Sequence, residues 1–154
     1  MLTDTERQEI QAQLPHYPDT RAACVEALKV VQHHRGWVSD EDLKSVAALL
    51  HMTPDELDGV ATFYNLIFRK PVGRHVVFLC NSISCWTMGY ERVHEEMKVR
   101  LGIDYGQTTQ DRRFTLLPIV CLGDCDHAPV MMIDEDLHRD VKPEKVDGIL
   151  EKYR

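Results

Sequence analysis

Two stretches decide the fold: HVVFLCNSISC at residues 75–85 and FTLLPIVCLGDC at residues 114–125. Each begins with a run of apolar and β-branched residues, which is typical of a buried strand. Each then carries a pair of cysteines, spaced C-x4-C in the first stretch and C-x3-C in the second. The four cysteines of these pairs are Cys80, Cys85, Cys121 and Cys125. Because each pair comes where a predicted strand runs out, we expect the thiols in loops that the strands hold still.

The spacing of these cysteines favours a 2Fe-2S cluster. Four thiolates from two loops can bind two irons, with two sulfurs on each iron. Four-iron clusters typically use closely repeated C-x2-C spacing, and zinc ribbons favour C-x2-C pairs. A zinc site and a thiol or disulfide role both stay open from spacing alone. A thioredoxin-like thiol enzyme would want a C-x-x-C pair at a helix start, which is absent.

Residues around the cysteines bear on a bound cluster. Ser82 and Ser84 can donate hydrogen bonds to sulfur, which raises a reduction potential. Gly123 has no Cβ, so we expect its backbone to approach the cluster closely. Asp124 and Asp126 add negative charge beside the ligands and push the potential the other way.

The rest of the second half predicts an α/β unit. Residues 88–101 have helical apolar spacing, and residues 130–133 read as a strand, followed by a turn and a short strand near Leu137. Pro143 opens a last helix whose apolar stripe ends at Tyr153. This order of strands and helices matches a small thioredoxin-like unit.

The first part of the chain predicts a bundle of four helices. Capping residues mark the helix starts. We assign these caps to Thr3 (with Glu6), Asp19 or Thr20, Ser39 (with Asp42) and Thr53 (with Glu56). We expect the last of these helices to bury Leu57, Val60, Ala61 and Tyr64. Because Pro71 and Gly73 interrupt the helical pattern, we predict a helical domain at residues 1–72 and a second domain at residues 73–154.

Composition excludes several classes of function. The chain has 154 residues, 44% hydrophobic and 28% charged, as is usual for a soluble globular protein. Its formal net charge of -7 gives no general attraction to phosphate, so we expect no nucleic-acid partner. No apolar run approaches the roughly 20 residues of a membrane span, and the first residues are too polar for a signal peptide. We therefore expect no direct membrane insertion, and a location in the cytosol or facing it. Because thiols stay reduced there, the five cysteines indicate metal binding or catalysis rather than disulfides.

Three stretches resemble one known family: VQHHRGWVS at residues 31–39, ATFYNLIFRKPVGRHVV at 61–77 and FTLLPIVCLGDCDHAPVMMID at 114–134. Together with the C-x4-C pair, they resemble the thioredoxin-like 2Fe-2S subunits of bacterial NADH:quinone oxidoreductase, or respiratory complex I. The similarity extends over almost the whole chain. It implies an α+β protein in which an N-terminal helical bundle precedes a thioredoxin-like α/β ferredoxin domain.

The resemblance also implies a cofactor and partners. One 2Fe-2S cluster would be held by ligands that match Cys80, Cys85, Cys121 and Cys125 one by one. The chain would be an electron-transfer subunit of an NADH dehydrogenase with no catalytic residue of its own. FMN and NADH would lie on a neighbouring flavoprotein subunit, whose flavin exchanges one electron with the cluster, and other peripheral-arm subunits would be further partners. Accordingly, the sequence has no G-x-G-x-x-G turn for a nucleotide.

Family membership leaves the parent complex open. Related subunits occur in NAD-linked formate dehydrogenases and hydrogenases, so an equivalent diaphorase subunit is the alternative, and a structural zinc-binding interaction module is an alternative of a different class. In complex I the subunit would lie peripherally on the cytoplasmic side of the inner membrane. The family commonly has Thr just before the second ligand, where this chain has Ser84.

A few residues have simpler interpretations. Cys24 lies on a helical apolar stripe, so we expect it in a core and not at a metal. His127 follows the last cysteine closely, and both a tuning role and ordinary exposure are open. Pro129 can be cis or trans. Phe63 and Tyr64 either contact a partner or pack against the second domain.

Overall fold

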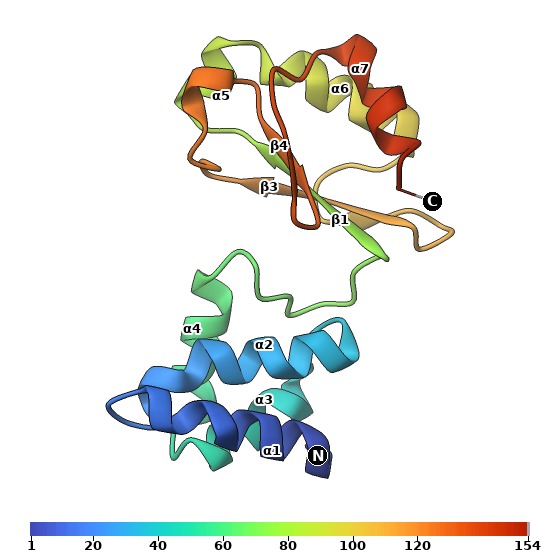
Figure 1. Ribbon diagram of the computed structural model, residues 1–154. Coiled ribbons are helices and arrows are strands. Elements are labelled where there is room, and N and C mark those ends of the chain that lie inside the picture. The colour runs from blue at the N-terminus through green and yellow to red at the C-terminus, as the bar shows by residue number, and fades with distance from the viewer. Residues whose placement is uncertain (154) are drawn as a thin grey trace. The chain divides into compact units, whose positions relative to one another are not determined.

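The computed structural model describes residues 1–153 and divides into two compact units, Met1–Pro71 and Val72–Arg154. The first unit is helical and the second contains a five-stranded sheet covered by helices (Figure 1). The predicted α+β class, with an N-terminal helical bundle before an α/β unit, is therefore confirmed.

The helical unit begins its helices largely where the capping residues predicted. Its helices are α1 (Asp4–Gln13), α2 (Cys24–Arg35), α3 (Asp40–Leu49) and α4 (Pro54–Phe63), with 3-10 turns at Leu14–His16 and Arg21–Ala23. The side chains of Thr3, Ser39 and Thr53 accept the predicted hydrogen bonds from backbone N–H groups three residues later. These bonds satisfy donors that the first turn of a helix leaves free.

The start of α2 differs from the prediction. Capping residues at Asp19 or Thr20 predict a helix that begins directly after them, but α2 begins at Cys24 after the 3-10 turn. The Asp19 carboxylate accepts from the Ala22 N–H at 2.9 Å and so caps that turn instead, while the Thr20 hydroxyl donates to the Leu50 carbonyl. Asp19 therefore caps a helical turn, but that turn is a 3-10 turn, and the α-helix begins only after it.

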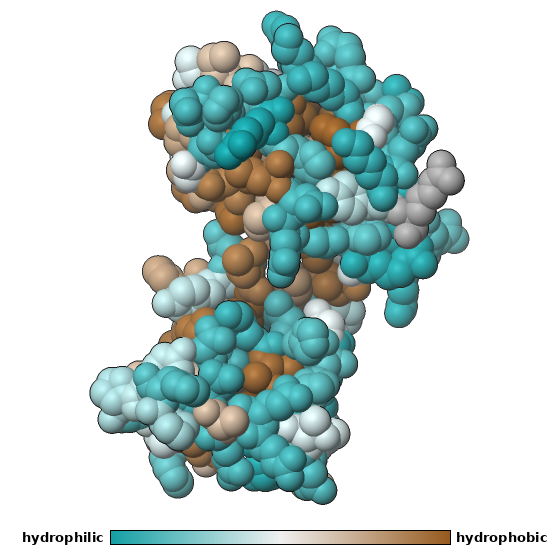
Figure 2. Space-filling model, viewed as in Figure 1, coloured by the Kyte–Doolittle hydropathy of each residue, from teal (hydrophilic) through white to brown (hydrophobic). Residues whose placement is uncertain are grey.

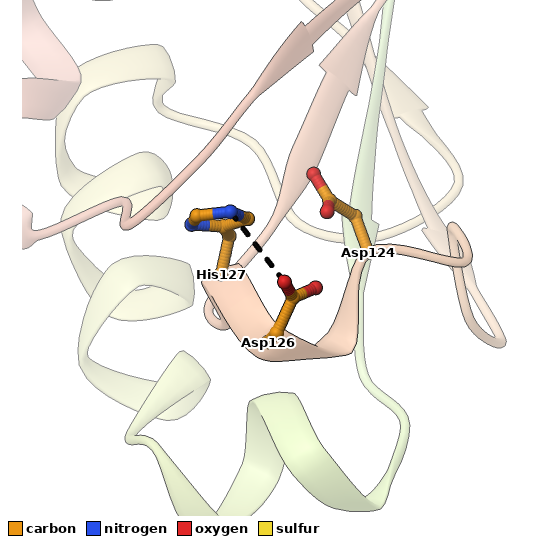
Figure 3. Close-up of side chains that lie close together, drawn as sticks. All are labelled: Asp124, Asp126 and His127. Atoms are coloured by element: carbon orange, nitrogen blue, oxygen red, sulfur yellow. Dashed lines mark ion pairs between the residues drawn. The ribbon is translucent and has the colours of Figure 1, made fainter.

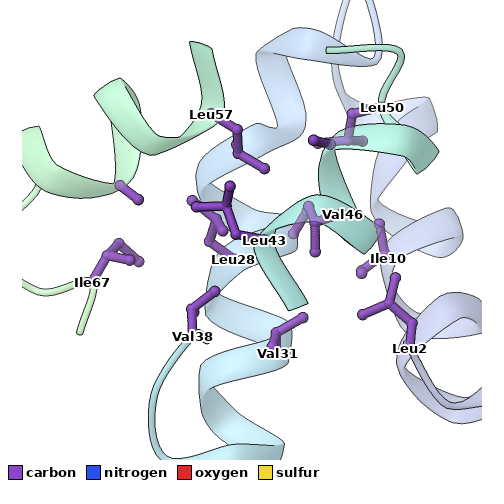
Figure 4. Packing of buried hydrophobic residues seen from close by; sticks show 13 residues of the cluster. Leu2, Ile10, Leu28, Val31, Val38, Leu43, Val46, Leu50, Leu57 and Ile67 are labelled. Carbon is purple, nitrogen blue, oxygen red and sulfur yellow. The ribbon is translucent and has the colours of Figure 1, made fainter. Parts of the chain in front are cut away.

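The apolar stripes of the four helices meet in one core (Figure 4). The residues labelled there are Leu2, Ile10, Leu28, Val31, Val38, Leu43, Val46, Leu50, Leu57 and Ile67. Cys24 packs against this core, as expected. The prediction for Tyr64 is wrong: α4 ends at Phe63, Tyr64 is extended, and its side chain is 46% exposed.

A buried ion-pair network ties three helices of this unit together. Arg35, at the end of α2, donates from Nε and Nη2 to the two carboxylate oxygens of Glu6 in α1, both at 2.6 Å. Its Nη1 donates to Asp42 in α3 at 2.5 Å. Glu6 and Asp42 are almost fully buried, so Arg35 neutralises two carboxylates that have little access to water.

This network predicts an acid-sensitive stability. The hydrogen bonds from Arg35 are the main cause that holds the pKa of Glu6 at about 2, against an ordinary 4.5. The folded state therefore binds fewer protons than the unfolded state, and the Glu6 contribution is complete above about pH 4.5 and lost as the pH falls through about 2. We expect it to be on the order of 3 kcal/mol.

Chemical denaturation of the chain and of Glu6→Gln across this pH range measures that contribution. The difference in unfolding free energy between the two proteins should shrink as the pH falls, and Glu9→Gln, at a more exposed carboxylate, serves as the control. A difference that stays constant with pH would contradict the assignment.

The second unit is a mixed sheet with helices on one face (Figure 1). Its elements are β1 (His75–Cys80), α5 (Ile83–Thr87), α6 (Tyr90–Leu101), β2 (Gln107–Thr108), β3 (Phe114–Ile119), a 3-10 turn (Cys125–His127), β4 (Met131–Ile133), β5 (Asp136–His138) and α7 (Pro143–Leu150). The strand order is β2-β3-β1-β4-β5, and β1 and β3 are parallel whereas the other neighbours are antiparallel.

Two short elements of this unit lie outside the sequence prediction. The helix expected at residues 88–101 begins only at Tyr90, because Gly89 has φ +91 and interrupts it, and α5 precedes it as a separate helix. The two-residue strand β2 also has no sequence signal of its own. Of these, α5 contributes to the site, because it contains Cys85.

Candidate metal centre

Sheet topology brings the two cysteine-bearing segments to one edge, although Cys80 ends β1 and Cys85 lies in α5, where the sequence predicted a loop. Because β1 and β3 are parallel neighbours, their carboxyl ends lie together, and Cys80 is in register with Ile119. Cys121 follows β3 after one further residue. The Asn81 N–H continues the ladder by donating to the Ile119 carbonyl at 3.1 Å, so the loops start from a rigid edge.

Cys80 lies in a pocket of backbone N–H groups. Burial by itself would raise its pKa, but the Ser82 N–H, the Cys85 thiol and the N–H groups of Leu122 and Cys121 all hydrogen-bond its sulfur and lower the pKa below the ordinary thiol value. Two of these donors come from the other cysteine-bearing loop. Converging N–H groups of this kind stabilise negative charge, which suits a thiolate ligand.

Cys85 is the buried partner of Cys80. It lies within the short helix α5 and is 1% exposed. Burial raises the pKa of its thiol to about 11, against a hydrogen bond from the Val130 N–H. A metal ion would supply the positive charge that such a buried thiolate needs.

Cys121 and Cys125 form a second pair, which is exposed. Their sulfurs are 3.6 Å apart, and the Gly123 N–H donates to Cys121 sulfur at 3.3 Å. The proximity of Cys121 raises the pKa of Cys125, and a hydrogen bond from the Ser84 side chain opposes this effect. Ser84 therefore links the first loop to a cysteine of the second.

The backbone of the second loop is unusual. Cys121 has φ +66 and Gly123 φ +80, so two residues of one short loop lie in the left-handed region. An added Cβ at Gly123 would meet no protein atom within 4 Å, and the close approach of its backbone to a cluster stays a prediction. Glycine is favoured there by the positive φ.

The sulfur positions fit a two-metal cluster better than one metal ion. A tetrahedral metal about 2.3 Å from each thiolate holds two sulfurs roughly 3.8 Å apart. The Cys121–Cys125 pair has this separation, and Cys80 and Cys85 form a second hydrogen-bonded pair. Within residues 1–153, no three of the cysteine sulfurs gather within 4.8 Å, as a single tetrahedral zinc would require. The four thiols therefore fit a 2Fe-2S cluster, which they would hold as two pairs.

Charged residues beside the second loop are partly neutralised. Asp124, Asp126 and His127 carry ligand atoms within 4.8 Å of one another (Figure 3). Arg139 forms an ion pair with Asp124 and lowers the pKa of that carboxyl, so Asp124 brings less net charge to the cluster than its sequence position suggested. His127 pairs with Asp126 and with Asp140 at the surface. Because these groups already pair with one another and with Arg139, we assign them no metal.

Sequence reasoning found the four cysteines but missed part of their surroundings. Arg139 lies 15 positions beyond Asp124 and carries no motif, and the N–H groups that surround Cys80 depend on the loop conformation. Ser84 is predicted to donate to a ligand sulfur, and its partner is the thiol of Cys125. The Ala128–Pro129 peptide bond, left open by the sequence, is cis.

Comparison with known proteins identifies the family. Residues 10–154 match the family model of thioredoxin-like [2Fe-2S] ferredoxins. The chain is 50% identical to the E subunit of NADH-quinone oxidoreductase from Pseudomonas aeruginosa, over 99% of this chain and 92% of that protein. It is 48% identical to the protein of the same name from Escherichia coli K12, with the same coverage. The resemblance stated from the sequence is thereby confirmed.

A solved structure supports the fold alone. An NAD+-reducing [NiFe]-hydrogenase in the air-oxidized state superposes with a TM-score of 0.68 at 21% identity, covering 82% of this chain and 22% of that one.

None of the helices in residues 1–153 has the length and hydropathy needed to cross a membrane.

Proposed function

Since the chain belongs to the thioredoxin-like [2Fe-2S] ferredoxin family, we propose that it is the cluster-bearing electron-transfer subunit of an NADH-quinone oxidoreductase. One observation carries this proposal: two pairs of cysteine thiols lie at one edge of the sheet, with backbone donors around them. The near full-length similarity to the quinone reductase proteins of two bacteria favours this parent complex over others.

We assign the cluster to Cys80, Cys85, Cys121 and Cys125. When bound, the cluster supplies one-electron transfer. The N–H groups of Ser82, Cys121, Leu122 and Gly123 hold the thiolates in place and favour their negative charge. The Ser84 hydroxyl holds Cys125 against the first loop. No acid, base or nucleophile of this chain takes part in the proposed reaction.

The electron partner in this proposal is a flavoprotein subunit that binds FMN and NADH. Exposed hydrophobic side chains flank the cysteines on both loops, and Figure 2 shows hydrophobic atoms at the surface on the side of α5. These residues are Ile83, Trp86, Met88 and Val120, all more than half exposed. A face that carries apolar groups and two exposed ligands gains from being covered, which supports docking of the electron partner there.

Replacing Trp86 by glutamate tests this contact. We expect association with the flavoprotein that copurifies with the chain to weaken by roughly 30-fold or more, because a buried interface tryptophan commonly contributes at least 2 kcal/mol. The matched control is Val99→Glu, at an apolar residue of α6 that is 75% exposed and lies away from the cysteines in sequence. Equal affinities for Trp86→Glu and the unchanged protein would remove the docking assignment.

The second candidate is the equivalent diaphorase subunit of a hydrogenase or formate dehydrogenase. The fold shared with an NAD+-reducing hydrogenase supports it, although that match is weaker in sequence. Identifying the proteins that copurify with the chain separates the two: quinone reductase subunits support the first proposal, and a hydrogenase or formate dehydrogenase catalytic subunit supports the second.

We further propose that residues 1–72 and 73–154 are separate domains of a peripheral subunit on the cytoplasmic side of the membrane.

A further inference from the structure

The loop that carries Cys121 and Cys125 is held by a charged contact from outside it. The Arg139 guanidinium donates from Nε to a carboxylate oxygen of Asp124, which directly precedes Cys125. The Asp124 side chain is only 14% exposed, whereas that of Arg139 is 58% exposed. Because neighbouring Cα atoms are about 3.8 Å apart, whatever fixes Asp124 also restricts where the Cys125 thiol can lie. The contact therefore bears on the geometry of the second thiol pair.

The backbone beside Arg139 is anchored independently of this contact. Arg139 directly follows β5, so the sheet holds the chain on its N-terminal side. On its other side, the Val141 N–H donates to the Pro129 carbonyl at 2.9 Å. Val141 is itself buried in the core of the α/β unit. The guanidinium therefore reaches Asp124 from a fixed base.

Backbone hydrogen bonds join the same two segments. The His127 N–H donates to the Asp124 carbonyl at 3.1 Å, and the His127 carbonyl accepts from the Asp140 N–H at 2.8 Å. These bonds involve no side chain of residues 124 or 139. A substitution at Arg139 therefore removes the charged contact and leaves the backbone path of both segments in place.

Arg139 also brings a permanent positive charge to a group of carboxylates. Asp126 and Asp140 both pair with His127, at 3.6 Å and 3.3 Å, but an imidazole is charged only when protonated. Arginine stays charged, and its partner carboxylate belongs to the residue before a proposed ligand. Reduction of a cluster adds one negative charge, so a cation held there favours the reduced form.

We propose that Arg139 is a positioning residue for the proposed cluster. Its ion pair with Asp124 holds the loop in the conformation that brings the thiols of Cys121 and Cys125 together, and its charge offsets that of Asp124 and so raises the reduction potential. The inference rests on the proposed function. Arg139 is not a metal ligand.

The test uses the full chain with its cluster and compares Arg139→Gln with Arg139→Lys. Glutamine removes the charge, so we expect a lower reduction potential. We also expect the visible absorption to be lost to an iron chelator roughly two- to fivefold faster, which is the size of a partly exposed ion pair. Lysine keeps the charge and should restore the potential of the parent. A role in folding alone would not move the potential.

Asp124→Asn and the combined variant Asp124→Asn/Arg139→Gln separate charge from position. Asp124→Asn alone should raise the potential, because it leaves the cation unpaired. The combined variant should return to the potential of the parent, because both charges are gone, but should keep the faster loss, because the contact is still missing. Either single variant tests the contact, so the test survives a folding failure in the other.

Arg100→Gln is the matched control. It removes the same charge from a side chain that is 45% exposed and pairs with Glu96 at 2.7 Å and Asp147 at 3.0 Å. Arg100 lies in the last turn of α6, about 15 Å along the helix from the end that follows α5. Arg100→Gln should leave the potential and the rate of loss unchanged.

Two results would overturn the proposal. One is an equal potential and an equal rate of loss in Arg139→Gln and Arg100→Gln. The other is a combined variant whose potential is as low as that of Arg139→Gln. A parent protein without iron would instead refute the proposed function, so the two failures are distinguishable.

Discussion

Cys85→Ala is expected to leave the chain folded but with almost no iron–sulfur cluster. Cys85 is buried and hydrogen-bonded to Cys80, so its removal would take away one of the four thiolates that we propose hold the cluster. Iron content, visible absorption and the EPR signal after reduction should all fall to near background. Circular dichroism of the purified variant checks that the fold is retained.

Cys24→Ala is the control for this experiment. Cys24 packs against the core of the helical unit and takes no part in the proposed site. It should keep the iron content and the EPR spectrum of the parent. If Cys85→Ala bound as much iron as Cys24→Ala, the ligand assignment would be wrong.

Arg35→Ala is expected to lower the unfolding free energy by roughly 3–5 kcal/mol, the largest stability effect that we expect in the helical unit. The substitution leaves the carboxylates of Glu6 and Asp42 buried without their shared cation. It also removes the bidentate contact between α1 and α2. Denaturant unfolding of the full chain, followed by circular dichroism, measures the loss.

Arg21→Ala provides the comparison within the same unit. Arg21 makes one ion pair with Glu56 at 2.6 Å, but both side chains are about half exposed, so its loss should lower the unfolding free energy far less than the loss of Arg35. Equal losses for the two arginine variants would show that burial of the network contributes little.

The elements that the sequence predicted best are those with strong local signals. The capping boxes at Thr3 and Thr53 act over three residues, and the strand at 75–80 is a continuous apolar run. Such features depend on neighbouring residues alone, so the sequence contains all the information needed. The cysteine spacing is local in the same sense.

What the sequence could not predict depends on contacts between distant segments. The strand β2 has only two residues and exists because it pairs with β3. The short helix α5 contains Cys85 and is too short to be stable in isolation. Two of the N–H groups around Cys80, those of Cys121 and Leu122, come from a loop about 40 positions away, which the pairing of β1 with β3 brings alongside. Propensity and periodicity do not report such contacts.

Metal analysis of freshly purified protein, combined with EPR after reduction, tests the central claim most directly. The account predicts about two iron atoms and two acid-labile sulfides per chain, with visible absorption and a one-electron EPR signal. A colourless protein that contains zinc, or no metal, and gives no EPR signal would contradict it.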